Sequence, residues 1–124
     1  MKILFDFKLF SEQRFGGPSK YFIELIKALN KKNINTEIFS PFYINEYLKS
    51  EKDLKKTGIY VKNKKYFGRL FNFTNKMITN VNSLITKADV IHNTYYQDPH
   101  LKRKQPNVLT VYDLIHEKFN KDFN

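Results

Sequence analysis

Three short segments of the chain combine residue types that could bind a phosphorylated ligand or a sugar. The first is the run Gly16-Gly17-Pro18-Ser19-Lys20-Tyr21, in which two glycines precede the start of an expected helix. Glycines let a ligand approach the backbone closely, and a helix N-terminus presents N–H groups and the positive end of the helix dipole to an anion. The G-x-G-x-x-G spacing of a dinucleotide site is absent. On spacing alone, an anion site and an ordinary loop before a helix explain the run equally well.

The second segment places His92 at the expected carboxyl end of a strand, followed closely by Tyr95 and Tyr96. Ligands of open α/β sheets bind at this edge, outside the carboxyl ends of the strands. A single histidine there is more often a structural residue than a catalytic one, and the tyrosines could line a pocket or simply pack. His92 is therefore a candidate catalytic residue and Tyr95 a candidate substrate-binding residue.

The third segment runs from Thr110 to Glu117 and carries Tyr112, Asp113 and Glu117 near the same expected edge. Ionised carboxylates accept hydrogen bonds from sugar hydroxyls, although the same carboxylates could cap a following helix.

Asp98 and His100 lie close together, but no third ligand follows at a spacing typical of a metal site, so we predict no metal. The chain has no cysteine, which excludes disulfides and zinc sites built on thiolates.

The charge balance is strongly basic, with 22 Lys and Arg against 12 Asp and Glu, a net charge of +10. The stretch from Lys49 to Arg69 holds eight basic and two acidic residues, and Lys102-Arg103-Lys104 forms a second cluster. A solvated surface is the simplest interpretation of this positive charge, contact with an anionic membrane face or a pyrophosphate-linked acceptor comes second, and nucleic-acid binding comes last.

Asp6 and Lys8 interrupt the N-terminal apolar run too early for a signal peptide. We expect a cytoplasmic chain that lies peripherally at the inner face of a membrane.

Hydrophobic periodicity predicts strands alternating with helices. Strands are expected at 2–7, 36–40, 59–61, 88–92 and 108–114, and an amphipathic helix is expected from Pro18 to about Lys31. A second helical stripe comprises Leu70, Phe71, Phe73, Met77, Ile78, Val81, Leu84 and Ile85, while residues 42–58 are not assigned. This alternation predicts a single α/β domain over residues 1–124, with an open, mainly parallel, Rossmann-like sheet flanked by helices.

Together the three segments resemble the N-terminal half of a family-4 glycosyltransferase of the GT-B fold. The likeness rests on Gly16-Gly17-Pro18-Ser19-Lys20-Tyr21-Phe22, on residues 88–96 (Ala-Asp-Val-Ile-His-Asn-Thr-Tyr-Tyr) and on residues 108–119 (Val-Leu-Thr-Val-Tyr-Asp-Leu-Ile-His-Glu-Lys-Phe). Such enzymes transfer a sugar from a nucleotide-sugar donor with retention of configuration, and usually need no catalytic metal or other cofactor. The resemblance implies that Gly16 and Gly17 lie near the donor diphosphate. It also implies that His92 and Asp113 lie near the transferred sugar, and that Lys20, Tyr95, Tyr112 and Glu117 contact substrate.

Two positions depart from the family pattern, because Tyr112 stands where many relatives have histidine and Lys20 stands where arginine is usual. Lysine keeps the charge but loses the bidentate geometry of arginine.

Nothing in the chain matches the family's C-terminal half, which holds the nucleotide and a paired-glutamate motif. The resemblance therefore implies an acceptor-side domain for surface-polysaccharide or lipid-linked glycan synthesis, which is inactive without the C-terminal donor domain. The chain would then be either a truncated product or one subunit of a split enzyme with a donor-domain partner chain. An incomplete sheet also predicts self-association. The alternative is a non-catalytic basic α/β module that binds a polyanion or a protein partner.

Overall fold

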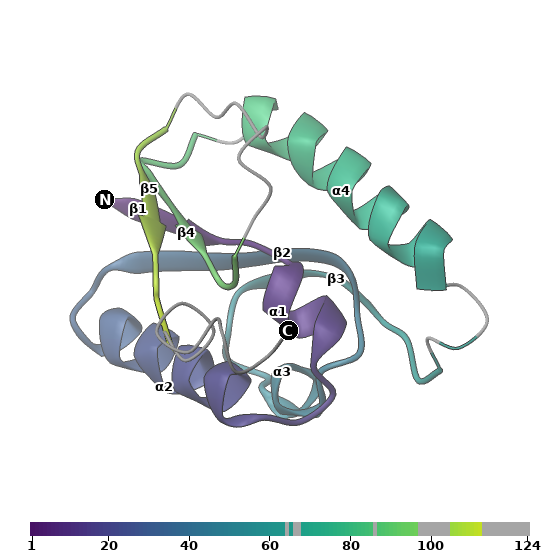
Figure 1. Ribbon diagram of the computed structural model, residues 1–124. Helices are drawn as coiled ribbons and strands as arrows, with labels where there is room; N and C mark the ends of the chain where they lie inside the picture. Colours follow the sequence, from purple (N-terminus) through teal and green to yellow (C-terminus); the bar gives the residue numbers. More distant parts are fainter. Residues whose placement is uncertain (64, 66–67, 86, 97–104, 113–124) are drawn as a thin grey trace, which may run out of the picture.

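A five-stranded parallel sheet forms the centre of the molecule in the computed structural model (Figure 1), which describes residues 1–63, 65, 68–85, 87–96 and 105–112. The strands lie in the order β3-β2-β1-β4-β5, and every neighbouring pair is parallel. Their bounds are Lys2–Phe5 (β1), Asn35–Tyr43 (β2), Lys56–Tyr60 (β3), Val90–Asn93 (β4) and Asn107–Leu109 (β5). The predicted Rossmann-like α/β fold is confirmed.

The strand order reverses beside β1. The chain builds outward from β1 through β2 to β3, then returns to place β4 on the other side of β1, where Phe5 is in register with His92. In open α/β sheets, the point where the order reverses leaves a crevice outside the carboxyl ends of the two central strands. The residues that follow β1 and β4 are therefore the first to consider for a site.

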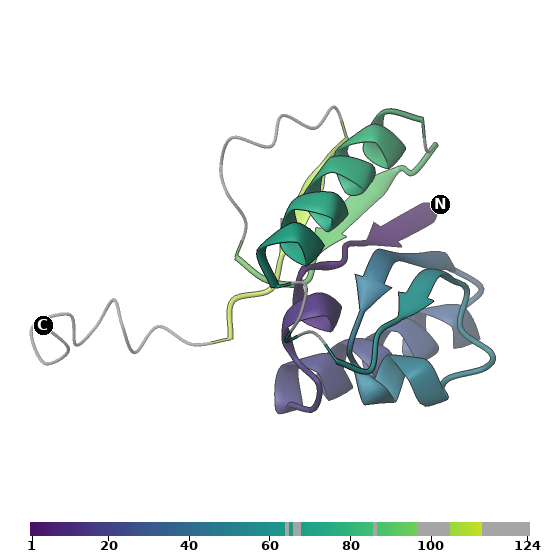
Figure 2. The same cartoon turned by 90° about the vertical axis from the view of Figure 1, so that its right-hand side faces the viewer.

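Three helices cover one face of the sheet (Figures 1 and 2): α1 (Lys8–Glu12), α2 (Gly17–Lys31) and α3 (Glu46–Ser50). The helix predicted from Pro18 to about Lys31 is confirmed as α2, which carries Pro18 in its first turn and buries Phe22, Ile23 and Ile26. These side chains pack with the other members of the main core: Phe5, Leu9, Phe10, Ile38, Tyr43, Leu48 and Leu54.

One helix among the described residues, α4 (Gly68–Ile85), lies on the other face of the sheet. The helix predicted from the stripe between Leu70 and Ile85 is confirmed as α4. Its core is smaller and consists of Leu4, Phe39, Ala88 and Ile91. Among the α4 side chains that the structure describes, those of Phe71, Asn75 and Thr79 are buried, whereas Leu70, Phe73, Met77, Ile78 and Val81 of the apolar stripe are exposed. Within the part of the chain that the structure describes, no helix combines the length and apolarity needed to cross a bilayer.

Several predicted boundaries were wrong. β2 continues through Pro41 to Tyr43, because Pro41 lies where the β2–β3 register shifts and its missing N–H removes no ladder bond. β3 comprises Lys56–Tyr60 rather than residues 59–61, and β5 ends at Leu109 because its partner β4 ends at Asn93. The helices α1 and α3 were not predicted, since five residues are too few to show a period.

Candidate functional site

A buried hydrogen-bond network joins the carboxyl ends of the two central strands. Asp6 Oδ1 accepts hydrogen bonds from the backbone N–H of Thr94 at 2.9 Å and from its hydroxyl at 2.6 Å. The same hydroxyl accepts from the backbone N–H of Leu9 at 3.0 Å, which fixes the start of α1. Asp6 and Thr94 are 2% and 0% exposed, so water does not compete for these bonds. The network sets the spacing of β1 and β4 at the point where a ligand crevice is expected.

His92 lies half-buried at the end of β4, between two aromatic rings. It stacks on Phe5 with ring centroids 5.1 Å apart and meets the edge of Phe22 at 5.2 Å. Burial lowers the pKa of His92, so the imidazole is neutral near pH 7. Its Nε2 shares a hydrogen bond of 2.9 Å with the Thr110 hydroxyl. His92 thus connects β4 to the segment that follows β5.

Tyr112 packs against Phe22, one of the two rings that contact His92. Its ring meets Phe22 and Tyr21 edge-on, with centroids 6.0 and 6.1 Å away, and its hydroxyl donates to the backbone carbonyl of Thr94 at 3.5 Å. Burial is the main cause that raises the pKa of Tyr112, and the neighbouring Tyr21 and Asp6 raise it further. The hydroxyl therefore stays protonated and acts as a hydrogen-bond donor at neutral pH.

A cavity of about 460 Å³ separates the first turn of α2 from the segment after β5. We call it the α2 cavity, and its lining consists of Gly17, Pro18, Tyr21, Thr110, Val111 and Tyr112. A Cβ atom added to Gly17 would have no neighbour within 4 Å, so the glycine leaves open space at the helix N-terminus. The N-cap residue of α2 is Gly16, which has no side chain to cap this end of the helix. Two segments that are far apart in the sequence, the glycine run and the Tyr112 segment, therefore line one cavity.

The other candidate residues are not among those that line the α2 cavity. Lys20 is exposed on the first turn of α2, and Gly16 is the N-cap residue of that helix. Tyr95 lines a separate cavity of about 340 Å³ against α1, whose other lining residues are Lys8, Leu9, Glu12 and Gln13. Asp113 and Glu117 lie outside the described residues.

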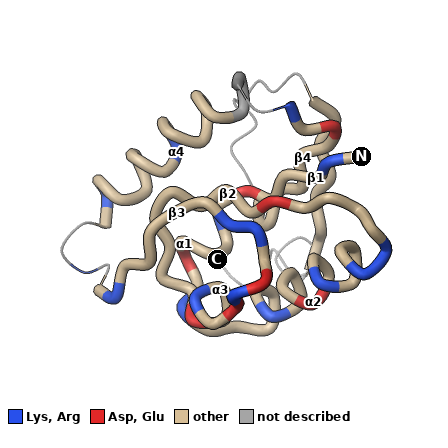
Figure 3. The backbone as a smooth tube through the Cα atoms, turned by 180° about the vertical axis from the view of Figure 1, so that it is seen from behind, with Lys and Arg blue, Asp and Glu red and all other residues tan. Residues whose placement is uncertain are grey.

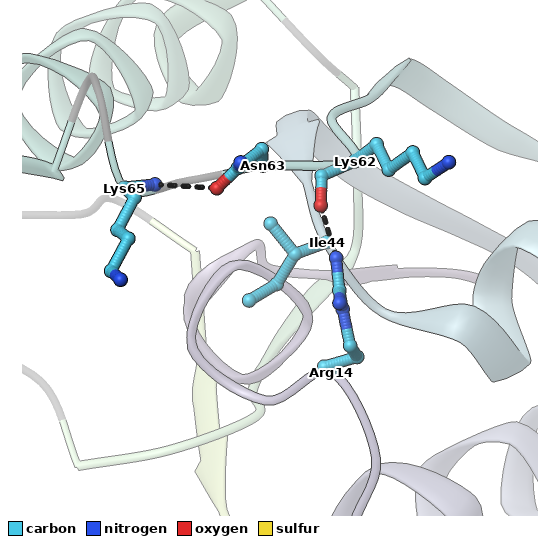
Figure 4. Close-up of a pocket in the computed structure, with 5 residues that line it drawn as sticks. All are labelled: Arg14, Ile44, Lys62, Asn63 and Lys65. Carbon is cyan, nitrogen blue, oxygen red and sulfur yellow. Dashed lines mark hydrogen bonds between the residues drawn. The ribbon is translucent and has the colours of Figure 1, made fainter.

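A cationic pocket of about 400 Å³ lies at the carboxyl ends of β2 and β3 (Figure 4), lined by Arg14, Ile44, Lys62, Asn63 and Lys65. The Arg14 guanidinium donates to the backbone carbonyl of Lys62 and lies 3.9 Å from a Glu46 carboxylate oxygen. The Lys65 N–H donates to the Asn63 side chain at 3.3 Å. Three of the five lining residues are cationic, although Figure 4 shows the Lys62 side chain pointing away from Arg14 and Ile44. The pocket lies at the same edge of the sheet as the α2 cavity, and an anion is the ligand that its cations suit.

The sequence analysis missed Asp6, Thr94 and Arg14. An acidic residue directly after an apolar strand was the available signal for Asp6, but its partner Thr94 is identified only by the strand order. Arg14 is isolated in the sequence, and folding alone brings it to Lys62. Among residues 1–63, 65, 68–85, 87–96 and 105–112, no group of three or more acidic, histidine or cysteine side chains is arranged to hold a metal ion.

Comparisons with protein-family models, with curated proteins and with solved structures found no match for this chain. The chemistry of the site is therefore argued from its own residues.

Proposed function

We propose that this chain is the acceptor-side domain of a retaining glycosyltransferase, which uses a nucleotide-sugar donor and works in the assembly of surface polysaccharide or lipid-linked glycan. One observation carries the proposal. The glycine run and the Tyr112 segment, two of the segments that resemble the family, line the same cavity at the carboxyl edge of a parallel sheet. Ligands of open α/β sheets bind at this edge.

The α2 cavity offers groups suited to a phosphorylated sugar. The first turn of α2 presents the positive end of the helix dipole, and Gly17 leaves room for a diphosphate to approach the backbone. The hydroxyl of Thr110 lines the cavity and is positioned by the neutral His92. The protonated Tyr112 hydroxyl donates to the Thr94 carbonyl, and movement of this long contact would free it for a ligand oxygen.

Other parts of this function rest on the sequence. In the proposal, Lys20 supplies a positive charge beside the diphosphate, and Asp113 and Glu117 bind sugar hydroxyls. Tyr95 contacts the acceptor from its own cavity beside α1. A donor domain completes the enzyme, so transfer requires both domains.

NMR titration of the isotope-labelled chain with inorganic pyrophosphate, the group of the donor that the glycine run would face, tests the proposal. We expect saturable shifts of the amide signals of Gly17, Lys20 and Tyr112. Gly17→Ala should weaken binding about tenfold or more, because the added methyl group occupies the open space at the helix N-terminus. Gly68→Ala is the matched control, since an added Cβ there also meets nothing within 4 Å and Gly68 begins α4, away from the cavity.

Two results would contradict the proposal: no shift at the α2 cavity with pyrophosphate, or equal weakening of pyrophosphate binding by both alanine variants. The cationic pocket of Arg14, Lys62 and Lys65 favours the second candidate, a non-catalytic module that binds a polyanion. For that module, binding to a single-stranded oligonucleotide should fall steeply with salt and should weaken in Lys62→Gln, while Gly17→Ala leaves it unchanged.

A further inference from the structure

The helix α4 has its apolar side turned away from the sheet. Leu70 and Phe73 are 62% and 60% exposed, and the rest of this outer face is exposed as well. We call these residues the α4 outer face: Leu70, Phe73, Met77, Ile78 and Val81. Successive members are three, four, one and three residues apart, which places them along one side of a helix. The side that faces the sheet instead carries Phe71, Asn75 and Thr79.

Specific hydrogen bonds fix this orientation. The Asn75 side chain accepts from the backbone N–H of Phe42 at 2.8 Å and donates to the backbone carbonyl of the same residue at 2.9 Å. Phe42 lies where the register of β2 and β3 shifts, so the amide supplies bonds that the ladder does not. Turning the apolar stripe inward would remove both bonds and leave part-buried backbone groups without these partners, which is costly. The outer face is therefore a consequence of how α4 is held.

Positive charge borders the α4 outer face. The helix contains no Asp or Glu, and its cations Arg69 and Lys76 are seven residues apart, on one flank beside Phe73. Figure 3 shows blue and no red along α4. Lys62 and Lys65 of the cationic pocket come shortly before the helix in the chain. An apolar strip with cations along its border is typical of a helix that lies in a membrane interface.

We propose that the α4 outer face docks onto the surface of an anionic lipid bilayer. Phe73 and its apolar neighbours enter the boundary between headgroups and acyl chains, while Arg69 and Lys76 extend toward lipid phosphates. Charge complementarity selects this occupant. A second copy would bring two +10 chains together through a helix that has no carboxylate to pair with Arg69 or Lys76. The proposal is independent of glycosyl transfer and assigns a surface that the α2 cavity does not use.

An apolar cavity beside the helix extends this surface. It has a volume of about 280 Å³ and is lined by Leu70, Phe71 and Thr74 of α4 together with Phe42 and Val61. Leu70 belongs both to the cavity wall and to the α4 outer face. The cavity enlarges the apolar area that docking removes from water, which is the favourable contribution in binding of this kind.

Single-tryptophan fluorescence tests the docking at one residue. The chain has no tryptophan, so Phe73→Trp and Phe15→Trp each report one site. The two phenylalanines are 60% and 62% exposed, and Phe15 packs against Tyr47 of α3 on the opposite face of the sheet. With vesicles of phosphatidylcholine and phosphatidylglycerol, emission from Phe73→Trp should shift to shorter wavelength, and emission from Phe15→Trp should not. Pure phosphatidylcholine vesicles should give little shift in either variant.

Sedimentation with the same vesicles measures affinity. Phe73→Gln should lower binding about tenfold or more, because a buried aromatic ring is lost, while Phe15→Gln should leave it unchanged. Arg69→Gln should lower binding to the anionic vesicles about fivefold. Circular dichroism of each variant checks that the fold is retained.

Three outcomes would overturn the docking proposal. The first is equal binding to neutral and anionic vesicles, or no binding to either. The second is an equal emission shift at both tryptophan sites. The third is a dimer that Phe73→Gln dissociates and that does not bind vesicles, which would make a second copy the occupant. Gly17→Ala should leave vesicle binding unchanged, so failure of the docking proposal and failure of the glycosyltransferase proposal are distinguishable.

Discussion

The two faces of the sheet are built differently. Ten buried apolar side chains form the core on the α1, α2 and α3 face. They come from these three helices, from β1 and β2 and from the loop before β3, and Phe5, Phe10 and Phe22 among them are fully buried. The α4 face has a core of four residues, and the helix over it buries Asn75 and Thr79 together with Phe71. Hydrophobic burial holds the first face, whereas hydrogen bonds from one amide to the backbone of β2 position the helix on the second.

The comparison shows that an amphipathic pattern does not determine which way a helix faces. Both α2 and α4 carry an apolar stripe at helical spacing. In α2 the stripe packs on the sheet, and in α4 it is exposed, because the β2 backbone at Phe42 needs polar partners that Asn75 provides. A helix whose apolar side is exposed indicates a surface that binds something, since large apolar patches on soluble domains are uncommon.

The largest contrast should appear when an aromatic ring is removed from each face. Phe22 is fully buried, so Phe22→Ala should lower the free energy of unfolding by about 3–5 kcal/mol through lost burial and a cavity. Phe73 is 60% exposed, so Phe73→Ala should change it by less than about 0.5 kcal/mol. Urea denaturation measures both. A large loss in the free energy of unfolding of Phe73→Ala would show that the α4 outer face is part of a core, and the two faces would then not differ in the way described.

A smaller but still substantial effect is expected at Asn75. Asn75→Ala leaves the Phe42 N–H and carbonyl without their side-chain partner, which should cost about 2 kcal/mol in the free energy of unfolding. Lys76→Ala is the control, because the neighbouring Lys76 is exposed. Urea denaturation gives both values. If the two variants are equally stable, then something other than the amide orients α4.

The sequence was sufficient for features that depend on local pattern. Alternating strands and helices predicted the parallel sheet, and the stripe from Tyr21 to Leu29 predicted α2. The expected edge position of His92 was also right, since His92 lies in β4 one residue before the strand ends. These inferences depend on period and on the rule that carboxyl ends of parallel strands share an edge.

The sequence was insufficient where contacts form between distant residues. The network of Asp6 with Thr94 and the pocket shared by Arg14 and Lys62 depend on strand order and register. The orientation of α4 depends on one shift of register next to Pro41, which no hydrophobic period reports. The roles of Asp113 and Glu117 stay predictions.

The smallest predicted effect concerns pH and the densely packed face. Burial lowers the pKa of His92 below its ordinary value of 6.5, so the unfolded chain binds a proton more readily than the folded one. Stability should therefore decrease as the pH falls through 6.5 and level off once the pH is below the pKa in the folded state. Among the described residues, the imidazole contacts the rings of Phe5 and Phe22 and the Thr110 hydroxyl, and none of these groups carries a charge that would offset the effect.

Urea denaturation of the chain and of His92→Gln across this pH range isolates the contribution of His92. The chain has three histidines, and the other two are present in both proteins, so their contributions cancel in the difference. We expect the difference to depend on pH, and to change less than the free energy lost in Asn75→Ala. A difference that is constant with pH would mean that water reaches the imidazole in the folded state. The α1, α2 and α3 face would then be less tightly packed over β4 than the aromatic contacts of His92 indicate.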